Sequence, residues 1–336
     1  MAHTPETPDW QFWIDRGGTF TDIVARAPDG RLLCHKVLSE HPECRRDAAL
    51  QGIRDLLDLA EDAPLPDHAI AAVKMGTTVA TNALLERSGE PTVFVTTAGL
   101  GDLPAIGDQS RPELFALAIH RPEPLHSRVI EVDERLDAGG CVVRALDEAD
   151  ARAQLEAARS EGYRACAIAL LHGHHNPIHE QRLAALAEAA GFTQVSVSHS
   201  VSPLIRLLSR AETTVVDAYL SPVLRRYVDR VAAELGDTRL RFMKSDGGLV
   251  DAARFRGRDA ILSGPAGGIV GCIETARRAG FQRVIGFDMG GTSTDVAHYA
   301  GELERTVDTT INGVMGDVGG GAAHVETDDP LEAGPA

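Results

Sequence analysis

The sequence lacks the features of a nucleic-acid-binding, membrane-spanning or disulfide-bonded protein. Only 4% of its 336 residues are aromatic, and 33 Lys and Arg stand against 49 Asp and Glu, giving a formal net charge of −16. So large a negative charge disfavours nucleic acid and anionic lipid as partners. The sequence contains no uncharged run long enough to cross a bilayer. We therefore expect neither a nucleic-acid partner nor a membrane partner.

Cysteine usage points to a reducing compartment. The five cysteines are an odd number and include no CxxC pair, so they do not indicate a disulfide framework. Residues 1–9 are polar, contain two prolines and lack the basic-then-apolar order of a signal peptide. These features predict a cytoplasmic protein.

Two common nucleotide-binding signatures are also missing. There is no GxxxxGK[ST] sequence, and no GxGxxG that follows a strand and opens a helix. P-loop and dinucleotide-binding folds are therefore disfavoured.

What the sequence does contain is one motif that occurs twice. The pattern DxGGTxTD begins at Asp15 and again at Asp288, and each copy lies between two apolar runs. This arrangement predicts two strand–turn–strand hairpins. Paired glycines let backbone N–H groups approach an anion closely, and the threonine after them can add a hydroxyl donor. A single copy could be an ordinary hairpin turn, but two matched copies favour two half-sites that hold one nucleotide across a cleft.

The two motifs supply most of the candidate site residues. Asp15 and Asp288, at the ends of their strands, are the catalytic candidates and the candidate ligands of a hydrated Mg²⁺, which offsets repulsion between carboxylates and a triphosphate. Asp22 and Asp295 are weaker candidates because they could simply fix hairpin geometry through local bonds. The candidate cofactor-binding residues of the motifs are Gly17, Gly18, Thr19, Thr21, Gly290, Gly291, Thr292 and Thr294.

A further candidate lies at the start of a predicted helix. The sequence Ser263-Gly264-Pro265-Ala266-Gly267-Gly268 opens a helix that runs to about Arg278, with Ser263 as N-cap and Pro265 in the first turn. Small residues and a helix N-terminus suit an anion, so Gly264 and Gly267 join the cofactor-binding candidates. A tightly packed hinge helix is the alternative explanation.

Hydrophobic periodicity predicts an α/β chain with an inserted unit. Three strands, a helix, a strand, a helix and a strand ending near residue 96 form one layer system. A long loop over 99–126 follows, and then a second, small α/β unit that could close over a substrate. The helical stretch 205–235 is expected to break near Pro222, which lacks a backbone N–H.

Several motifs together resemble the hydantoinase A and 5-oxoprolinase family. They lie at residues 10–24, 74–87, 263–268 and 286–295, in the order found in the family. The opening Trp10-Gln11-Phe12-Trp13 is most similar to ATP-hydrolysing 5-oxoprolinases. The resemblance implies an actin-like ATPase fold, as in Hsp70 and the sugar kinases, in which two ribonuclease-H-like lobes close on ATP with one phosphate hairpin from each.

The resemblance also implies a domain plan. Residues 9–280 would form lobe I, with the insertion at about 100–200, and residues 281–312 would form the first hairpin of lobe II. Family members continue well past this hairpin, whereas residues 313–336 are rich in Gly, Ala and acidic residues and are predicted to be a disordered tail. The second lobe would then be incomplete, so we expect a truncated chain that needs a partner half.

The activity implied by the resemblance is the ATP-dependent opening of a cyclic amide. ATP would phosphorylate the amide oxygen of 5-oxo-L-proline, and water would then open the ring to L-glutamate. Asp15 and Asp288 would position Mg²⁺ and the attacking group, and the Gly-Gly-Thr turns would hold the β- and γ-phosphates. The hydrolytic half would come from a hydantoinase B-like second subunit or a C-terminal half. The alternatives are a hydantoin hydrolase, a subunit of an ATP-dependent ketone carboxylase, and a non-catalytic fragment that binds a partner subunit.

Overall fold

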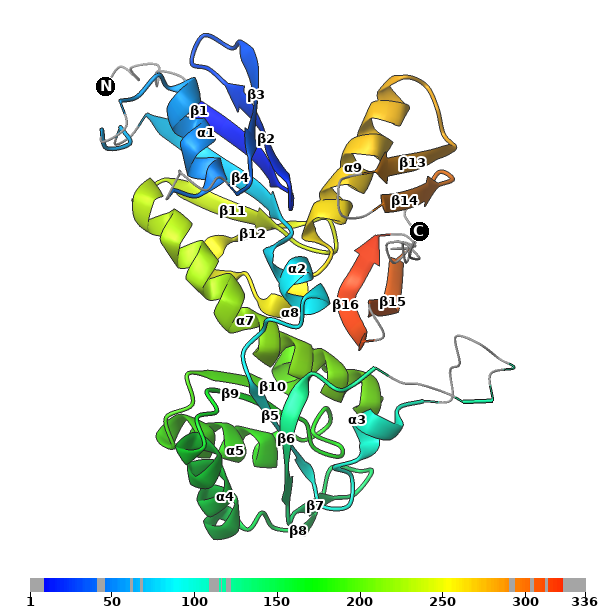
Figure 1. Cartoon of the computed structure of the whole chain (residues 1–336). Helices are drawn as coiled ribbons and strands as arrows, with labels where there is room; N and C mark the ends of the chain where they lie inside the picture. Colours follow the sequence, from blue (N-terminus) through cyan, green and yellow to red (C-terminus); the bar gives the residue numbers. More distant parts are fainter. Residues whose placement is uncertain are drawn as a thin grey trace, which may run out of the picture.

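The computed structural model describes residues 9–40, 46–60, 63–66, 69–108, 115, 117–118, 122–289, 294–302, 305–311 and 314–322. These residues form two β-sheets with helices packed against them. One long helix joins the two sheets, and a further helix and two hairpins follow (Figure 1). The α/β class expected from the sequence is confirmed.

The first sheet has six strands in the order β12-β11-β4-β1-β2-β3. Strands β1, β2 and β3 are antiparallel neighbours. Strand β4 runs parallel to β1, and β11 runs parallel to β4. An antiparallel meander extended by parallel strands is the arrangement expected of a ribonuclease-H-like lobe. Its strands are β1 (Trp10–Arg16), β2 (Phe20–Arg26), β3 (Leu32–Leu38), β4 (Ile70–Thr77), β11 (Arg239–Met243) and β12 (Leu249–Asp251).

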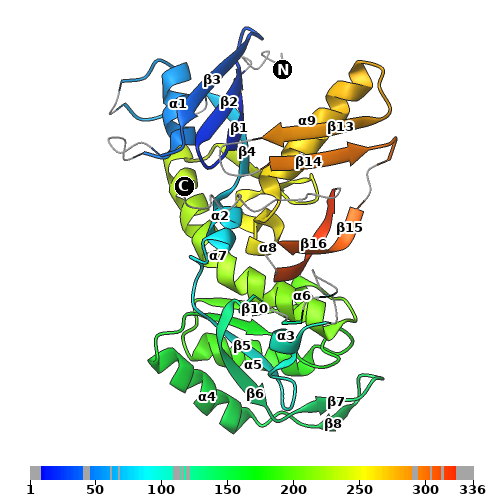
Figure 2. The same ribbon diagram turned by 45° about the vertical axis from the view of Figure 1, so that its right-hand side comes forward.

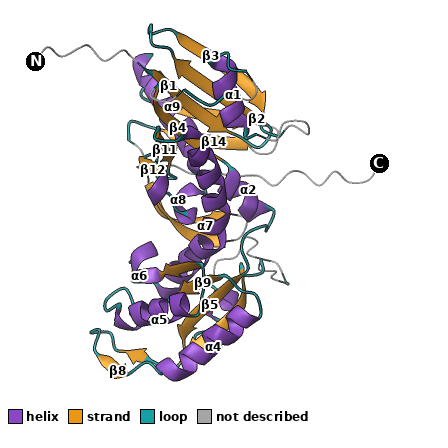
Figure 3. Ribbon diagram, turned by 90° about the vertical axis from the view of Figure 1, so that its left-hand side faces the viewer, coloured by secondary structure: helices purple, strands orange, loops and turns teal. Residues whose placement is uncertain are grey.

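The two faces of this sheet differ in their environment. Phe12 and Ile14 on one face are buried in a core to which α1 (Ala48–Leu56) and α7 (Leu207–Leu235) also contribute. Figure 3 shows α1 beside the strands of this sheet. Asp47 begins α1, since its carboxylate accepts a hydrogen bond from Ala49 N at 3.0 Å. Along β2, exposed and buried residues alternate, as expected of a half-buried strand, and Asp22 lies on the exposed face. This alternation places the acidic side chains of the first hairpin outside the core.

The second sheet is fully parallel, and its two central strands are buried on both faces, as is typical of such sheets. Its order is β10-β9-β5-β6, and every residue of β5 and β9 is buried. Helices α4 and α5 pack on one face, and the N-terminal part of α7 packs on the other. The elements here are β5 (Thr92–Thr97), β6 (His126–Val132), α4 (Glu148–Ser160), β9 (Ala165–Ile168), α5 (Ile178–Ala189) and β10 (Gln194–Val197), with the short α2 (Val79–Leu85), α3 (Leu103–Ile106), β7 (Arg135–Leu136), β8 (Val142–Arg144) and α6 (Ser198–Val201) around them.

Helix α7 connects the two sheets without interruption, so the expected break at Pro222 is wrong. Its 29 residues extend on the order of 40 Å. Val215 and Val216 pack in its first half and Leu224 and Val228 in its second, all within one continuous core. Burial along both halves outweighs the local loss of a helical hydrogen bond at proline.

The last elements lie opposite β1–β3 (Figure 2). Helix α9 (Ser263–Arg278) packs on the hairpin of β13 (Val284–Met289) and β14 (Thr294–Tyr299) through a small core around Ile269 and Ile273. A short connection of η1 (Ala252–Arg254) and α8 (Gly257–Ala260) precedes α9. None of the described helices is long and apolar enough to cross a bilayer.

The expected disorder of residues 313–336 is wrong for part of that segment. Strand β16 (Val314–Ala322) pairs antiparallel with β15 (Arg305–Ile311). Gly-rich composition predicted a tail, but backbone hydrogen bonding across the hairpin does not depend on side-chain burial. Residues 323–336 lie outside the described part of the chain.

Candidate functional site

The first DxGGTxTD motif forms the predicted strand–turn–strand hairpin. Asp15 lies opposite Asp22 across the β1–β2 ladder, and Gly17 N donates to Phe20 O at 3.0 Å to close the turn. A Cβ on Gly17 would lie only 2.9 Å from Phe20 O, so this turn requires glycine. The hairpin prediction is confirmed here.

The second motif repeats this register. Asp288 lies opposite Asp295 in the β13–β14 ladder, just as Asp15 lies opposite Asp22 in β1–β2. The two predicted hairpins are therefore equivalent in backbone pairing as well as in sequence. Thr294 is placed in β14, but its side chain lies outside the description, as do the predicted binding residues Gly290, Gly291 and Thr292.

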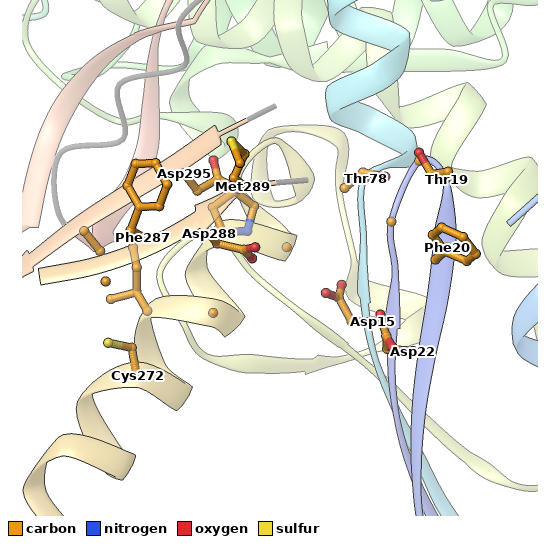
Figure 4. Close-up of a pocket in the computed structure, with 18 of the residues that line it drawn as sticks. Asp15, Thr19, Phe20, Asp22, Thr78, Cys272, Phe287, Asp288, Met289 and Asp295 are labelled. Carbon is orange, nitrogen blue, oxygen red and sulfur yellow. The ribbon is translucent and has the colours of Figure 1, made fainter. Parts of the chain in front are cut away.

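One cleft of about 600 Å³ lies between the two hairpins. Asp15 enters it from the β1 wall and Asp288 from the β13 wall, and their carboxylates point toward one another (Figure 4). Gly18 and Thr19 also line it, as predicted. The complete set of lining residues is Asp15, Gly17, Gly18, Thr19, Phe20, Asp22, Lys36, Thr78, Gly264, Pro265, Gly268, Ile269, Cys272, Gly286, Phe287, Asp288, Met289, Asp295 and Ala297.

The carboxylates of the cleft influence one another. The pKa of Asp15 is raised, first by loss of solvent and then by the charges of Asp22 and Asp288. The pKa of Asp295 is raised in the same way, by loss of solvent and by Asp288 and Asp15. Like charges this close disfavour one another's ionisation, so a cation between the two walls would relieve the repulsion.

The N-terminus of α9 closes the cleft at its base. Ideal Cβ positions on Gly76 and Gly264 lie 3.2 and 3.9 Å from Asp15 Oδ1, so small residues surround this carboxylate. Gly264 lines the cleft, whereas Gly267 does not: a Cβ on Gly267 would lie 3.9 Å from the Met243 side chain, and its role in cofactor binding stays a prediction. Gly268, about one helical turn after Gly264, lines the cleft with it.

Two predicted polar roles differ in the structure. Thr21 is buried and its hydroxyl bonds Ser39 Oγ at 3.0 Å, while Ser39 donates to Gly17 O at 2.7 Å. Thr21 therefore supports the turn from behind and does not line the cleft. Ser263 is the first residue of α9 and not its N-cap, because its hydroxyl donates to Met243 O at 2.7 Å.

The cleft also contains residues that the motif analysis did not identify. Lys36 lies on β3, opposite Asp22. Thr78 directly follows β4, and its hydroxyl donates a hydrogen bond to Arg16 O at 3.2 Å. Phe20, Cys272 and the apolar residues of β13 complete the walls. Strand alternation provides a signal for Lys36, since residues opposite Asp22 share its face.

The carboxylate cluster predicts a pH-dependent stability. Because the pKa of Asp295 is raised in the folded chain, its contribution to stability is complete below the unfolded pKa of about 3.9 and is lost as pH rises through the folded pKa. We expect D295N without Mg²⁺ to melt roughly 1–3 °C above the unsubstituted chain at pH 7, with the difference narrowing toward about pH 4.

Thermal unfolding between about pH 4 and 8 measures this difference. As a contrast, D29N removes an exposed carboxylate whose pKa is lowered by Arg31, and is expected to give no increase in Tm. A Tm for D295N at or below that of the unsubstituted chain at pH 7 would contradict the electrostatic account.

Known proteins are similar to this chain in both sequence and fold. Profiles described as the hydantoinase/oxoprolinase N-terminal region and hydantoinase/oxoprolinase match residues 11–191 and 210–323. The chain is 40% identical to 5-oxoprolinase of Saccharomyces cerevisiae and to 5-oxoprolinase 1 of Arabidopsis thaliana, over 90% and 91% of its length but only 27% and 26% of theirs. It is 34% identical to caprolactamase subunit alpha of Pseudomonas jessenii, over 97% of this chain and 50% of that protein.

Solved structures agree with this relationship. ATP-dependent caprolactamase from Pseudomonas jessenii superposes with a TM-score of 0.78 at 31% identity, covering 94% of this chain and 47% of that one. Nucleotide-free acetone carboxylase gives a TM-score of 0.79 at 22% identity, with 95% and 47% coverage, and supports the fold alone.

The fold is of the actin-like ATPase type. Within that class the chain belongs to the hydantoinase/oxoprolinase family. It spans about a quarter of the length of the 5-oxoprolinases and half that of the caprolactamase subunit.

Proposed function

We propose that this chain provides the ATP-binding cleft of an ATP-dependent cyclic-amide hydrolase that converts 5-oxo-L-proline to L-glutamate. The observation that carries the proposal is the pair of hairpins in identical register, with Asp15 and Asp288 facing each other across one cleft. Relatives named 5-oxoprolinase at 40% identity support the choice of substrate.

The chemistry requires activation because an amide is a poor electrophile. Transfer of the terminal phosphoryl group of ATP to the amide oxygen makes that oxygen a leaving group, and water can then add to the carbon and open the ring. We assign the backbone N–H groups of Gly18 and Thr19 the role of holding phosphate oxygens, because the N–H of Gly17 closes the turn, and we assign the matching role to Gly290–Thr292. Thr19 adds a hydroxyl donor on the same wall.

Asp15 and Asp288 fit a hydrated Mg²⁺. Protein sites hold this ion through one or two carboxylates together with waters and substrate phosphates, and not through a complete cage of side chains. One carboxylate enters from each wall, and no group of three His, Cys, Asp or Glu in the described part of the chain could form such a cage. When bound, the metal would neutralise charge on the phosphates while the two aspartates orient it.

The exposed face of β13 supports a partner half. By the shared register, Ile285 and Phe287 correspond to Phe12 and Ile14 of β1; the first pair is 73% and 67% exposed, the second 0% and 4%. Among the described strands, β13 pairs with β14 alone, whereas β1 also pairs with β4. We propose that a further polypeptide half completes this lobe and that a hydantoinase B-like subunit or C-terminal half supplies the hydrolytic step.

The caprolactamase relationship favours a second candidate, an uncharged lactam in place of 5-oxoproline. The hydantoin and ketone alternatives would use the same cleft and differ in the molecule that accepts the phosphoryl group.

We also propose a cytoplasmic location for this chain. The four described cysteines are all free thiols, which supports a reducing compartment.

Calorimetry and a product assay test the proposed function. The full chain is expected to bind Mg-ATP weakly and to release no glutamate from 5-oxo-L-proline until the partner half is added. Absence of Mg-ATP binding under all conditions would contradict the ATP assignment, and rapid glutamate release by this chain alone would contradict the need for a partner. Parallel assays with caprolactam and hydantoin separate the substrates.

A further inference from the structure

Lys36 occupies a distinctive position in the cleft. Its Nζ lies 2.6 and 2.7 Å from the two carboxylate oxygens of Asp22, and 5.2 Å from the centroid of the Phe20 ring. Cross-strand pairing of β3 with β2 places Lys36 opposite Asp22, and both project into the cleft. The ammonium group is thus held between a carboxylate and an aromatic face.

The charges of the cleft are unbalanced around this lysine. Its described walls carry four aspartates, Asp15, Asp22, Asp288 and Asp295, and Lys36 is the one Lys or Arg side chain among the lining residues. An anionic substrate would meet repulsion from every charged group in these walls except Lys36. Mg²⁺ can neutralise the centre of the cleft, between the walls, but it does not provide a donor at the β2–β3 side.

The contact between Lys36 and Asp22 can be exchanged. The two side chains are 56% and 55% exposed, and ion pairs in that environment contribute little because water competes for both partners. Lysine has a long, flexible stem and a compact charge, and it serves as a point-charge donor to phosphate and carboxylate oxygens.

We propose that Lys36 is the anion-recognition residue of this cleft, which exchanges Asp22 for an anionic oxygen group of the bound substrate. The inference rests on the proposed function and deepens it. The anion is either the terminal phosphate of ATP or the carboxylate of 5-oxo-L-proline, and both present oxygens to the same donor. Phe20 restrains the ammonium group on the cleft side of β3, close to its new partner.

Binding measurements on the full chain distinguish these sources. The probes are Mg-ATP, Mg-ADP, 5-oxo-L-proline and 2-pyrrolidinone, the same lactam ring without a carboxylate. If Lys36 binds the terminal phosphate, K36M is expected to bind Mg-ATP about 10–100-fold more weakly than the unsubstituted chain, while its affinity for Mg-ADP changes by less than about twofold. If Lys36 binds the carboxylate, K36M is instead expected to lose the preference for 5-oxo-L-proline over 2-pyrrolidinone.

The chain offers a matched control. Lys74 lies on the same sheet with its Nζ 4.9 Å from the centroid of the Trp13 ring, but it does not line the cleft. K74M therefore removes a lysine in a similar aromatic contact and is expected to leave all four affinities unchanged. K36R keeps the charge and is expected to restore much of the binding that K36M loses.

The outcomes separate this inference from the proposed function. An unsubstituted chain that binds Mg-ATP, together with a K36M variant that binds every probe equally well, would overturn the role of Lys36 alone. An unsubstituted chain that binds no probe would overturn both. Because Lys36 is exposed, K36M is expected to fold normally, and an unchanged Tm verifies this.

Discussion

Replacing Asp15 with asparagine is expected to lower Mg-ATP affinity by about 10–100-fold. The carboxylate lies at the end of β1, surrounded by Gly76 and Gly264, and it faces Asp288 across the cleft. Asparagine preserves the shape of the side chain but removes the charge that attracts the metal. Since the pKa of Asp15 is raised by burial and by neighbouring carboxylates, D15N should also leave the metal-free chain at least as stable as before.

Titration calorimetry with and without Mg²⁺ measures the first effect, and thermal unfolding measures the second. The matched control is D29N, an exposed aspartate paired with Arg31 at the far end of the β2–β3 hairpin. Its affinity for Mg-ATP should equal that of the unsubstituted chain. A D15N variant that retains full Mg²⁺-dependent affinity would show that Asp15 does not hold the metal.

Replacing Arg210 with alanine is expected to lower the free energy of unfolding by about 3–5 kcal/mol. This guanidinium is fully buried; it donates to Ser198 Oγ at 2.8 Å, to Leu204 O at 2.7 Å and to Leu170 O at 2.6 Å. Burial lowers the pKa of Arg210, and the charge of Glu180 opposes that shift. R210A would remove the positive charge of Arg210 and leave the fully buried Glu180 carboxylate without it.

Urea unfolding of R210A measures this loss of stability. R226A is the matched control on the same helix, because Arg226 is 61% exposed and its contact is an ion pair with Glu90 at 3.3 Å; a change within about 0.5 kcal/mol is expected. Arg210 joins α7 to the carboxyl ends of β9 and β10. A change of less than about 1 kcal/mol for R210A would show that this network contributes little to the attachment of α7.

The hairpins could be predicted from sequence because their information is local. Glycine pairs flanked by apolar runs specify a turn between two strands, and repetition of the motif indicated two walls of one site. The equal register of Asp15 with Asp22 and of Asp288 with Asp295 follows from the same local pattern.

The features that could not be predicted from sequence depend on contacts between residues that lie far apart in the chain. Pro222 lies within a continuous helix because packing along both halves of α7 supports it. Thr21 and Ser263 carry the residue types of a phosphate contact and an N-cap, but each hydroxyl bonds a group distant in sequence. Lys36 lies 14 residues after Asp22, and only strand pairing brings it into the cleft.

If both hairpins hold the same polyphosphate, a crystal structure of the full chain with Mg²⁺ and a non-hydrolysable ATP analogue will show it bound between them. Phosphate oxygens are then expected within hydrogen-bond distance of the Gly17–Thr19 turn on one wall and of Gly290–Thr292 on the other, with the metal between Asp15 and Asp288. A nucleotide that contacts only one hairpin, or that binds outside the cleft, would contradict this expectation.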